Sequence, residues 1–306
     1  MPLFDRKAVG FSTPIALPTT PTETETWQAA NRAWWESRPM RYDWGDTIEA
    51  AEFSKEYYRQ IDDRFLESLR HFLPWRTKPL EQLIPFASLS SKDVLEIGVG
   101  CGNHAQLLAS NARSFVGIDL TDFAARCTSE RMKLFGLDAK ILRMDAELMD
   151  FPDNSFDFIW SWGVIHHSAN TRRILEQMHR VLRPGGTAVT MVYHRNFWNY
   201  YLVSGLFRGV LGGEFLKTRS LNEILQKQTD GALARHYTEG EWKELVGDLF
   251  TVRSSRIFGM KSEIVPLPGG SIKTVVESLI PDSVGRALTN SAKMGTFLVT
   301  ELQKQA

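Results

Sequence analysis

One stretch constrains the fold more than any other, the run Asp93-Val-Leu-Glu-Ile-Gly-Val-Gly-Cys-Gly-Asn103. It begins with the apolar pattern of a buried strand and continues with three glycines at alternating positions, Gly98, Gly100 and Gly102. The residues that follow have the pattern of a helix start. A strand, a glycine turn and a helix allow a ligand to approach backbone N–H groups closely. Such turns also occur in α/β proteins without a cofactor, so this stretch alone does not identify a function.

The alternation of strands and helices continues beyond this turn. Strands are expected at 114–119, 139–145, 156–161 and 187–192, and helices at 121–135 and 174–182. This order predicts an α/β fold with a doubly wound, mostly parallel sheet. Two later strands are expected near 250–255 and 295–300.

The segments on either side of this core are rich in aromatic residues. Residues 1–25, rich in threonine and proline, predict an extended or mobile arm, and helical patterns follow at 27–35 and 50–73. We expect an arm and helices over 1–90, a main domain over 91–306, and a helical cap inserted at about 193–247. The aromatic residues of the arm, including Tyr42 and Trp44, either pack it onto the body or form a lid over a ligand.

Composition narrows the class of protein. The 306 residues carry 36 Lys and Arg and 36 Asp and Glu, a balance that gives no electrostatic reason to expect nucleic acid or an anionic membrane as a partner. Two cysteines in a chain of this size fit a reducing compartment better than a disulfide framework. With no signal-peptide pattern at the N-terminus and no long apolar run, we expect a cytoplasmic protein.

Three strand ends carry features of one binding site. The glycine turn follows the first strand, Asp119 ends the second and Asp145 ends the third. Ligands of doubly wound sheets bind beyond the carboxyl ends of the strands, and an acid about 20 residues after the first glycine reaches ribose hydroxyls. Both a dinucleotide and S-adenosylmethionine fit this pattern. Asn103 stands where a dinucleotide fingerprint has its third glycine, which favours S-adenosylmethionine.

Five motifs in this order resemble the signature of class I S-adenosylmethionine-dependent methyltransferases, in the broad subgroup that acts on small molecules. They are Glu96-Ile-Gly-Val-Gly-Cys-Gly102, Gly117-Ile-Asp119, Asp145-Ala-Glu147, Phe151-Pro-Asp-Asn-Ser-Phe-Asp157 and Arg183-Pro-Gly-Gly186. The resemblance covers roughly residues 85–195. It implies a Rossmann-like sheet of seven strands, with the last strand antiparallel, and S-adenosylmethionine as cofactor.

The resemblance also implies roles for single residues. Glu96 and the glycine loop would border the methionine moiety, and Asp119 would accept from both ribose hydroxyls. Asp145, with the Ala146 backbone, would face the adenine amine. Ser161 and Trp162 would border the methionine end.

The chemistry of methyl transfer needs alignment of the acceptor, exclusion of water and, for a protonated acceptor, a base. His166 and His167 follow the fourth strand beside the expected methyl group, and histidine suits proton removal near neutral pH. Alternatively, one caps the next helix and the other packs. Residues Tyr193 to Arg195 end the fifth strand and either contact the substrate or anchor the cap.

The sequence indicates less about the methyl acceptor than about the cofactor. Arg195, Arg235 and Lys261 are candidates to hold a substrate carboxylate, or are surface charges. The sequence at 161–164 lacks the Asn/Asp-Pro-Pro-aromatic tetrapeptide of adenine and amide methyltransferases, and two cysteines are too few for arsenic methylation. We therefore expect a small molecule methylated on oxygen or sulfur, less readily on nitrogen, with no metal. A non-catalytic S-adenosylmethionine-binding protein and a nicotinamide-dependent oxidoreductase remain the alternatives.

Overall fold

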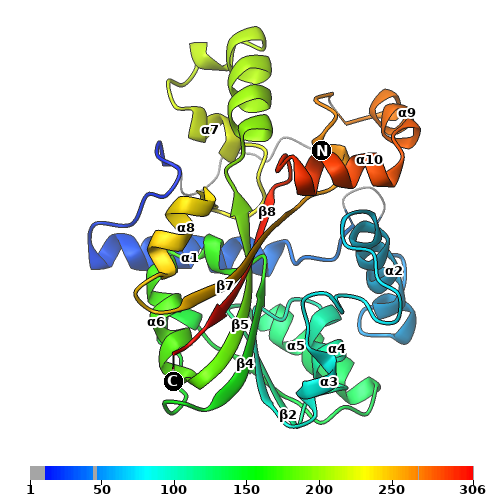
Figure 1. Cartoon of the computed structure of the whole chain (residues 1–306), viewed down its shortest axis with the longest axis vertical. Helices are drawn as coiled ribbons and strands as arrows, with labels where there is room; N and C mark the ends of the chain where they lie inside the picture. The colour runs from blue at the N-terminus through cyan, green and yellow to red at the C-terminus, as the bar shows by residue number, and fades with distance from the viewer. Residues whose placement is uncertain (1–10, 44–46, 268, 306) are drawn as a thin grey trace.

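A mixed β-sheet with the strand order β3-β2-β1-β4-β5-β8-β7 forms the centre of the computed structural model (Figure 1), which describes residues 11–43, 47–267 and 269–305. Its strands are β1 Asp93–Ile97, β2 Ser114–Asp119, β3 Lys140–Arg143, β4 Phe156–Trp162, β5 Leu182–His194, β7 Thr251–Phe258 and β8 Phe297–Gln303. β8 pairs antiparallel with β5 and β7, whereas the pairs from β3 to β5 are parallel. The predicted fold, with its antiparallel last strand, is confirmed. A two-residue strand, β6 (His236–Tyr237), also pairs with β5.

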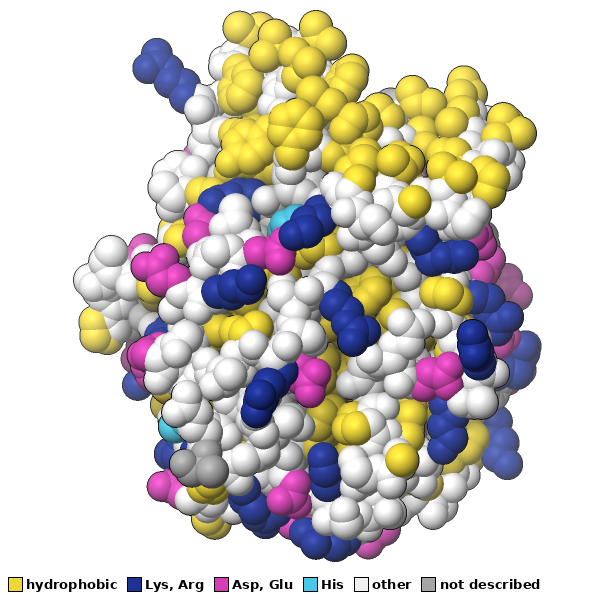
Figure 2. Space-filling view, viewed as in Figure 1, with side chains coloured by type: hydrophobic (Ala, Val, Ile, Leu, Met, Phe, Trp, Pro, Cys, Tyr) yellow, Lys and Arg dark blue, Asp and Glu magenta, His cyan; other side chains and the backbone are white. Residues whose placement is uncertain are grey.

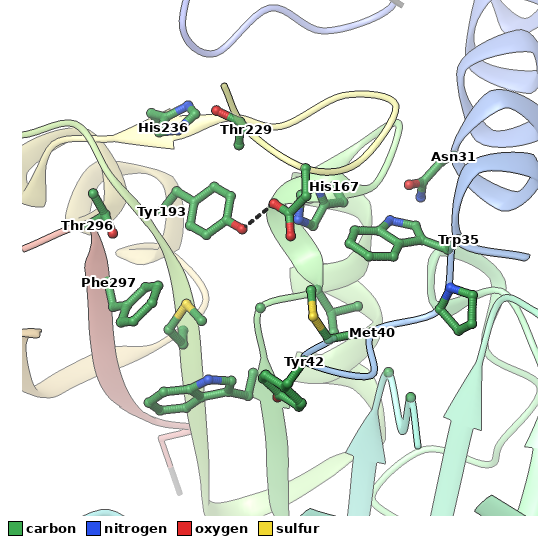
Figure 3. A pocket seen from close by; sticks show the side chains of 18 of the residues that line it. Asn31, Trp35, Met40, Tyr42, His167, Tyr193, Thr229, His236, Thr296 and Phe297 are labelled. Carbon is green, nitrogen blue, oxygen red and sulfur yellow. Dashed lines mark hydrogen bonds between the residues drawn. The ribbon is translucent and has the colours of Figure 1, made fainter. Parts of the chain in front are cut away.

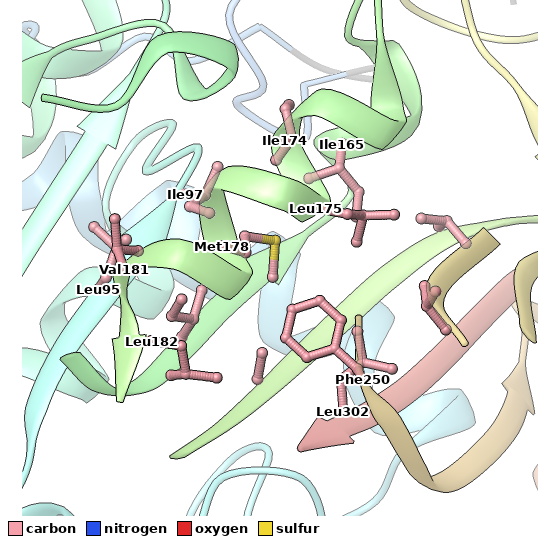
Figure 4. Close-up of a cluster of buried hydrophobic side chains, with 14 of the residues drawn as sticks. Leu95, Ile97, Ile165, Ile174, Leu175, Met178, Val181, Leu182, Phe250 and Leu302 are labelled. Atoms are coloured by element: carbon pink, nitrogen blue, oxygen red, sulfur yellow. The ribbon is translucent and has the colours of Figure 1, made fainter. Parts of the chain in front are cut away.

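Helices cover both faces of this sheet because successive side chains of each strand point to opposite faces. Leu95 and Ile97 of β1 pack into a cluster with the apolar stripe of α6 (Figure 4). Val94 packs on the other side with α2 and α4. The helices of these layers are α2 Lys55–Phe72, α3 Phe86–Leu89, α4 Asn103–Ala109, α5 Asp122–Leu134, α6 Thr171–Val181 and α8 Glu239–Val246. The sheet is therefore packed on both faces, and the strand ends stand at its edge.

The N-terminal segment departs from the expectation of an extended arm up to residue 25. Helix α1 spans Pro21–Ser37 and therefore begins inside the Thr-Pro-Glu stretch. Thr20 caps the helix by accepting from the Glu23 backbone N–H, and a proline occupies the first turn, where its missing N–H costs nothing. These start signals override the composition of the stretch. Trp27 of α1 is buried and stacks on Phe11.

The first part of the segment between β5 and β7 projects from one end of the molecule (Figure 1), whereas α8, in its last part, packs beside the sheet. It contains a π-helix, η3 (Phe197–Leu211), followed by α7 (Leu221–Gln226) and β6. After β7 the chain forms α9 (Ser271–Leu279) and α10 (Asp282–Arg286), which project at the same end. Among the described residues, none of the helices combines the length and apolar sequence that crossing a bilayer requires.

Candidate active site

A cavity of about 680 Å³ lies beyond the carboxyl ends of β1, β2, β4 and β5. One half of its wall is formed by the glycine loop and the ends of β2 and β3. The other half is formed by α1, the end of β5, the segment 228–236 and the segment 260–267. Figure 3 shows side chains from these separate segments pointing toward a common space. The sheet edge predicted to bind a ligand is therefore hollow in the folded chain.

The three glycines of the loop serve different purposes. All have positive φ angles, which favour glycine. A Cβ on Gly98 would lie 2.2 Å from a Val164 methyl carbon, so Gly98 is needed for packing of the loop on the chain after β4. A Cβ on Gly100 would meet no heavy atom within 4 Å, so this backbone faces open space in the cavity. Gly102 does not line the cavity and caps the N-terminus of α4.

Asp119 lies on the cavity wall and accepts three hydrogen bonds. Its Oδ1 accepts from the backbone N–H and hydroxyl of Thr121, at 3.0 and 2.8 Å, and its Oδ2 accepts from the Gly100 N–H at 3.1 Å. A carboxylate offers about four acceptor positions, so one remains for a ligand. Burial raises the pKa of Asp119, while the bonds from Thr121 and Gly100 oppose that shift. The bond to Gly100 also fixes the loop relative to β2.

Asp145 is held by helix α1. The Gln28 Nε2 donates to both oxygens of Asp145, at 2.9 and 3.0 Å, while the Gln28 Oε1 accepts from the Ala169 N–H at 3.1 Å. Gln28, Asn31 and Asp145 all line the cavity. Gln28 thus ties α1 to the cavity wall, and Glu36, near the other end of α1, accepts from the backbone N–H groups of Asp122 and Phe123 at 2.8 and 3.0 Å.

We expect Gln28→Ala to loosen α1, because it removes two contacts to a charged carboxylate and one to a backbone N–H. Hydrogen exchange of the amides in 21–37 should become about tenfold faster, in line with the loss of one charge-assisted bond. Gln28→Glu should loosen the helix further, since it places a second carboxylate against Asp145. Exchange unchanged in both variants, measured by mass spectrometry, would show that the Gln28 bonds do not hold the helix.

The far half of the cavity combines polar groups and aromatic rings. The Tyr193 hydroxyl donates to Asp230 Oδ1 at 2.6 Å (Figure 3), and the Tyr193 ring stacks on His236 with 5.3 Å between ring centroids. Burial and the nearby Asp230 raise the pKa of Tyr193 well above its usual value, so its hydroxyl stays protonated. Tyr42 and Phe297 add aromatic surface to the same wall.

His167 lines the cavity between these two halves. Its Nδ1 lies 2.7 Å from the Leu233 carbonyl oxygen. A carbonyl oxygen accepts only, so Nδ1 carries the proton in this contact and the lone pair resides on Nε2. The Trp35 ring lies edge-on to the imidazole at 5.1 Å, and a Cβ on Gly231 would lie 2.5 Å from Nδ1. The orientation of the ring is therefore fixed on several sides.

Comparison with known proteins finds a family match for one part of the chain. A family model described as a methyltransferase domain matches residues 95–190. The chain is 38% identical over 100 residues to phthiotriol/phenolphthiotriol dimycocerosates methyltransferase of Mycobacterium tuberculosis, covering 32% of this chain and 36% of that protein. It is 29% identical over 141 residues to tRNA U34 carboxymethyltransferase of Pseudoalteromonas atlantica, covering 40% and 43%. The chain thus spans less than half the length of either relative.

A solved structure superposes on almost the whole length of this chain. The structure of geranyl diphosphate C-methyltransferase from Streptomyces coelicolor superposes with a TM-score of 0.54 at 13% identity, covering 94% of this chain and 99% of that one. Residues 95–190 carry the methyltransferase domain, of the class I S-adenosylmethionine-dependent type.

The cofactor implied by the methyltransferase family is S-adenosylmethionine, and the residues present fit it. Gly100 leaves backbone accessible to a ligand, and Asp119 has one acceptor position left for a ribose hydroxyl. Ala146 and Trp162 also line the cavity, beside Asp145. Glu96 and Ser161 lie behind this wall: Glu96 is buried 3.7 Å from His104 Nδ1, and the Ser161 hydroxyl is buried without a hydrogen-bond partner among the described residues. His104 itself faces the methyltransferase cavity.

Several other residues predicted for the site do not line the cavity. His166 is fully buried behind His167, with 4.1 Å between the ring centroids. His194 Nδ1 contacts the Gly295 carbonyl at 3.0 Å, and Arg195 pairs with Glu241. Arg235 is buried and donates to the carbonyls of Ala16, Ser168 and Ala169, so it joins the N-terminal segment to the domain. Trp44 falls outside the described residues.

Sequence reasoning missed important parts of the methyltransferase cavity wall. Gln28, Asn31 and Trp35 come from α1, and only the tryptophan carried a signal, as one of the aromatic residues of the arm. Asp230 precedes a glycine, and this pair is typical of a turn. Glu263 lies in the long connection after β7 and gave no signal.

Glu263 is a titratable group of the methyltransferase cavity. It accepts from the backbone N–H groups of Met260 and Thr296, at 3.0 and 2.9 Å, and burial raises its pKa from 4.5 to about 7. Between these two values the folded chain binds the proton more tightly than the unfolded chain. The free energy of unfolding therefore falls as pH rises through this window.

We expect Glu263→Gln to flatten this dependence, because the amide does not titrate. The wild-type loss is at most about 3 kcal/mol from the pKa difference, and less because the side chain retains some solvent contact. Urea unfolding at about pH 5 and about pH 8 measures it. Glu130→Gln, at an exposed carboxyl of α5, is the matched control. Identical slopes for wild type and Glu263→Gln would contradict the prediction.

Proposed function

We propose that the protein transfers a methyl group from S-adenosylmethionine to an oxygen or sulfur atom, less readily a nitrogen atom, of a small molecule. The acceptor occupies the half of the cavity bounded by Tyr193, Asp230 and Phe297. His167 receives the acceptor proton. Residues 1–90 cover the site, residues 91–306 form the methyltransferase domain, and the cap at about 193–247 encloses the acceptor.

The continuity of the cavity is the observation that carries this proposal. A single cavity is lined both by Gly100, Asp119 and Asp145 and by His167 and Tyr193. A site that only binds the cofactor needs no second, polar half beyond the loop. The space beside His167 argues for an acceptor and against a non-catalytic binding protein.

The proposed reaction requires the protein only to orient the acceptor, exclude water and accept a proton. When bound, S-adenosylmethionine supplies a methyl group already activated by its sulfonium. The protein orients the acceptor and excludes water, which the aromatic walls and α1 do. His167 Nε2 holds the lone pair that takes the proton, while its Nδ1–H remains bonded to Leu233. The hydroxyl of Tyr193, fixed by Asp230, orients a polar group of the acceptor.

The other candidate acceptors and activities have less support. One relative is named for tRNA, but this chain has equal numbers of basic and acidic residues, 36 each, and so lacks the charge excess that phosphate recognition favours. A nicotinamide oxidoreductase would use a pyrophosphate cradle, and Asn103 replaces the third glycine of that fingerprint.

A screen of acceptors tests the proposal. Purified protein is incubated with S-adenosylmethionine and with pools of thiols, phenols, amino acids and sugars, and products one methyl heavier are detected by mass spectrometry. We expect adenosylhomocysteine to form together with one methylated product. The His167→Asn variant distinguishes enzymatic from spontaneous methylation. Cofactor binding by calorimetry with no product from any pool would support the binding-protein alternative.

A further inference from the structure

Two helices at the projecting end have inverted polarity. A helix that covers a protein normally turns its apolar stripe inward. In α9, Ile272, Val275 and Leu279 lie on one face and are all exposed, while Lys273 faces the cavity. Lys273 lies 3.8 Å from Glu277 on that inner side. Leu279 is 75% exposed and Leu216, in the turn after η3, is 92% exposed. Burial of these two side chains therefore contributes nothing to the stability of the fold.

Helix η3 repeats the pattern. Its inner side carries Asn199, Ser204 and Arg208, which line the cavity, and two glycines that are buried. Its outer side is apolar. Together these exposed residues form what we call the outer apolar face, consisting of Phe197, Tyr201, Leu206, Phe207, Val210, Leu211, Leu216, Ile272, Val275 and Leu279. Figure 2 shows hydrophobic side chains gathered over both projections at this end of the molecule.

Two basic side chains at the edge of this face have no acidic partner among the described residues. Lys217 directly follows Leu216, Arg219 lies two residues further along the chain, and both are exposed. Neither forms an ion pair with another described residue, whereas the nearby Glu214 is neutralised by Lys227 at 2.7 Å. Exposed apolar side chains bordered by free cations are the combination that binds the interface of an anionic bilayer.

We propose that the outer apolar face docks on the surface of an anionic lipid bilayer, with Leu211, Leu216, Ile272 and Leu279 entering the headgroup region. Lys217 and Arg219 contact the lipid phosphates. The two separate projections suit a deformable lipid surface better than a rigid protein partner, which needs one continuous complementary face. The neutral composition gave no reason to expect a membrane, but folding concentrates these residues at one end. This proposal is independent of the acceptor proposed above.

Vesicle sedimentation with the full-length chain tests this proposal. The vesicles contain phosphatidylcholine alone or phosphatidylcholine and phosphatidylglycerol in equal parts. We expect wild type to sediment with the anionic vesicles. The pair Leu211→Ser with Leu216→Ser, and independently the pair Ile272→Ser with Leu279→Ser, should weaken binding at least about tenfold. Lys217→Glu with Arg219→Glu should weaken binding to anionic vesicles specifically.

The matched control is Leu148→Ser, which alters a side chain that is 64% exposed on a short helix beside α6, away from this face. It should bind vesicles like wild type. Since every altered side chain is exposed, thermal unfolding midpoints should stay close to wild type. Wild type that does not sediment, or equal losses in the control, would overturn the proposal. A dimer in solution that Leu211→Ser with Leu216→Ser dissociates, without vesicle binding, would instead assign the face to a second copy of the chain.

Discussion

Replacing His167 with alanine is expected to lower kcat by at least about 100-fold, with little change in the affinity for S-adenosylmethionine. General-base catalysis contributes typically about 10²–10⁴ in rate. In the proposed function the effect falls on turnover, because the Nε2 lone pair acts on the acceptor proton, whereas Gly100, Asp119 and Asp145 line the half of the cavity assigned to the cofactor. Single-turnover kinetics with the acceptor found in the screen, together with calorimetry of the cofactor, separate the two quantities.

The variant His167→Asn distinguishes a catalytic from a structural role. The asparagine amide nitrogen takes the place of Nδ1 and can still donate to the Leu233 carbonyl, 2.7 Å away in wild type. It has no equivalent of Nε2. A base is lost equally in the alanine and asparagine variants, whereas a purely structural role is restored by asparagine. Recovery of wild-type kcat in His167→Asn would therefore exclude His167 as the base.

Replacing Asp119 with alanine is expected to weaken S-adenosylmethionine binding by about 10- to 100-fold. A hydrogen bond to a charged group contributes about 1.5–3 kcal/mol, and one acceptor position of Asp119 remains for the ligand. The variant also frees the Gly100 N–H from its bond to Oδ2, which loosens the loop. Isothermal titration calorimetry with S-adenosylmethionine measures the change.

The variant Asp122→Ala is the control for the loss of a negative charge near the cavity. Asp122 lies three residues away at the start of α5, its side chain is 72% exposed, and it is absent from the cavity wall. It should bind the cofactor like wild type. Equal losses in the two variants would point to a general field effect, and wild-type affinity in Asp119→Ala would remove Asp119 from the cofactor site.

The strands of the sheet were predictable because local signals and tertiary structure agree. Each of β1, β2 and β4 is an apolar run. Glycines or acidic residues follow these runs, and because such residues are not expected inside a buried sheet, they mark where the strands end. The start of α1 was missed because the composition of residues 18–26 suggested an arm, while the cap at Thr20 acts through a single hydrogen bond. The strand β5 begins at Leu182, directly after α6, although its Pro-Gly-Gly sequence indicates a turn.

The cavity wall around the glycine loop was more predictable from the sequence than the wall around Tyr193 and Asp230. Asp119 and Gly100 follow from strand ends within one stretch of sequence. His166 and His167 are neighbours, and sequence alone does not show which of the two faces the cavity, because this depends on the short helical turn that holds them. Arg235 was a candidate to bind a carboxylate, but its guanidinium donates hydrogen bonds to three backbone carbonyls instead. Asp230 and Gln28 reach the site through long-range packing that no local pattern encodes.

The two halves of the cavity also come from different parts of the chain. The glycine loop, Asp119 and Asp145 lie inside the segment shared with the family, residues 95–190. Tyr193, Asp230 and Glu263 lie outside it. In the function proposed above, binding of the methyl donor and choice of the acceptor thus depend on separate segments of the chain. Under the proposed function, exchanging the later segments would change the acceptor while the source of the methyl group stays the same.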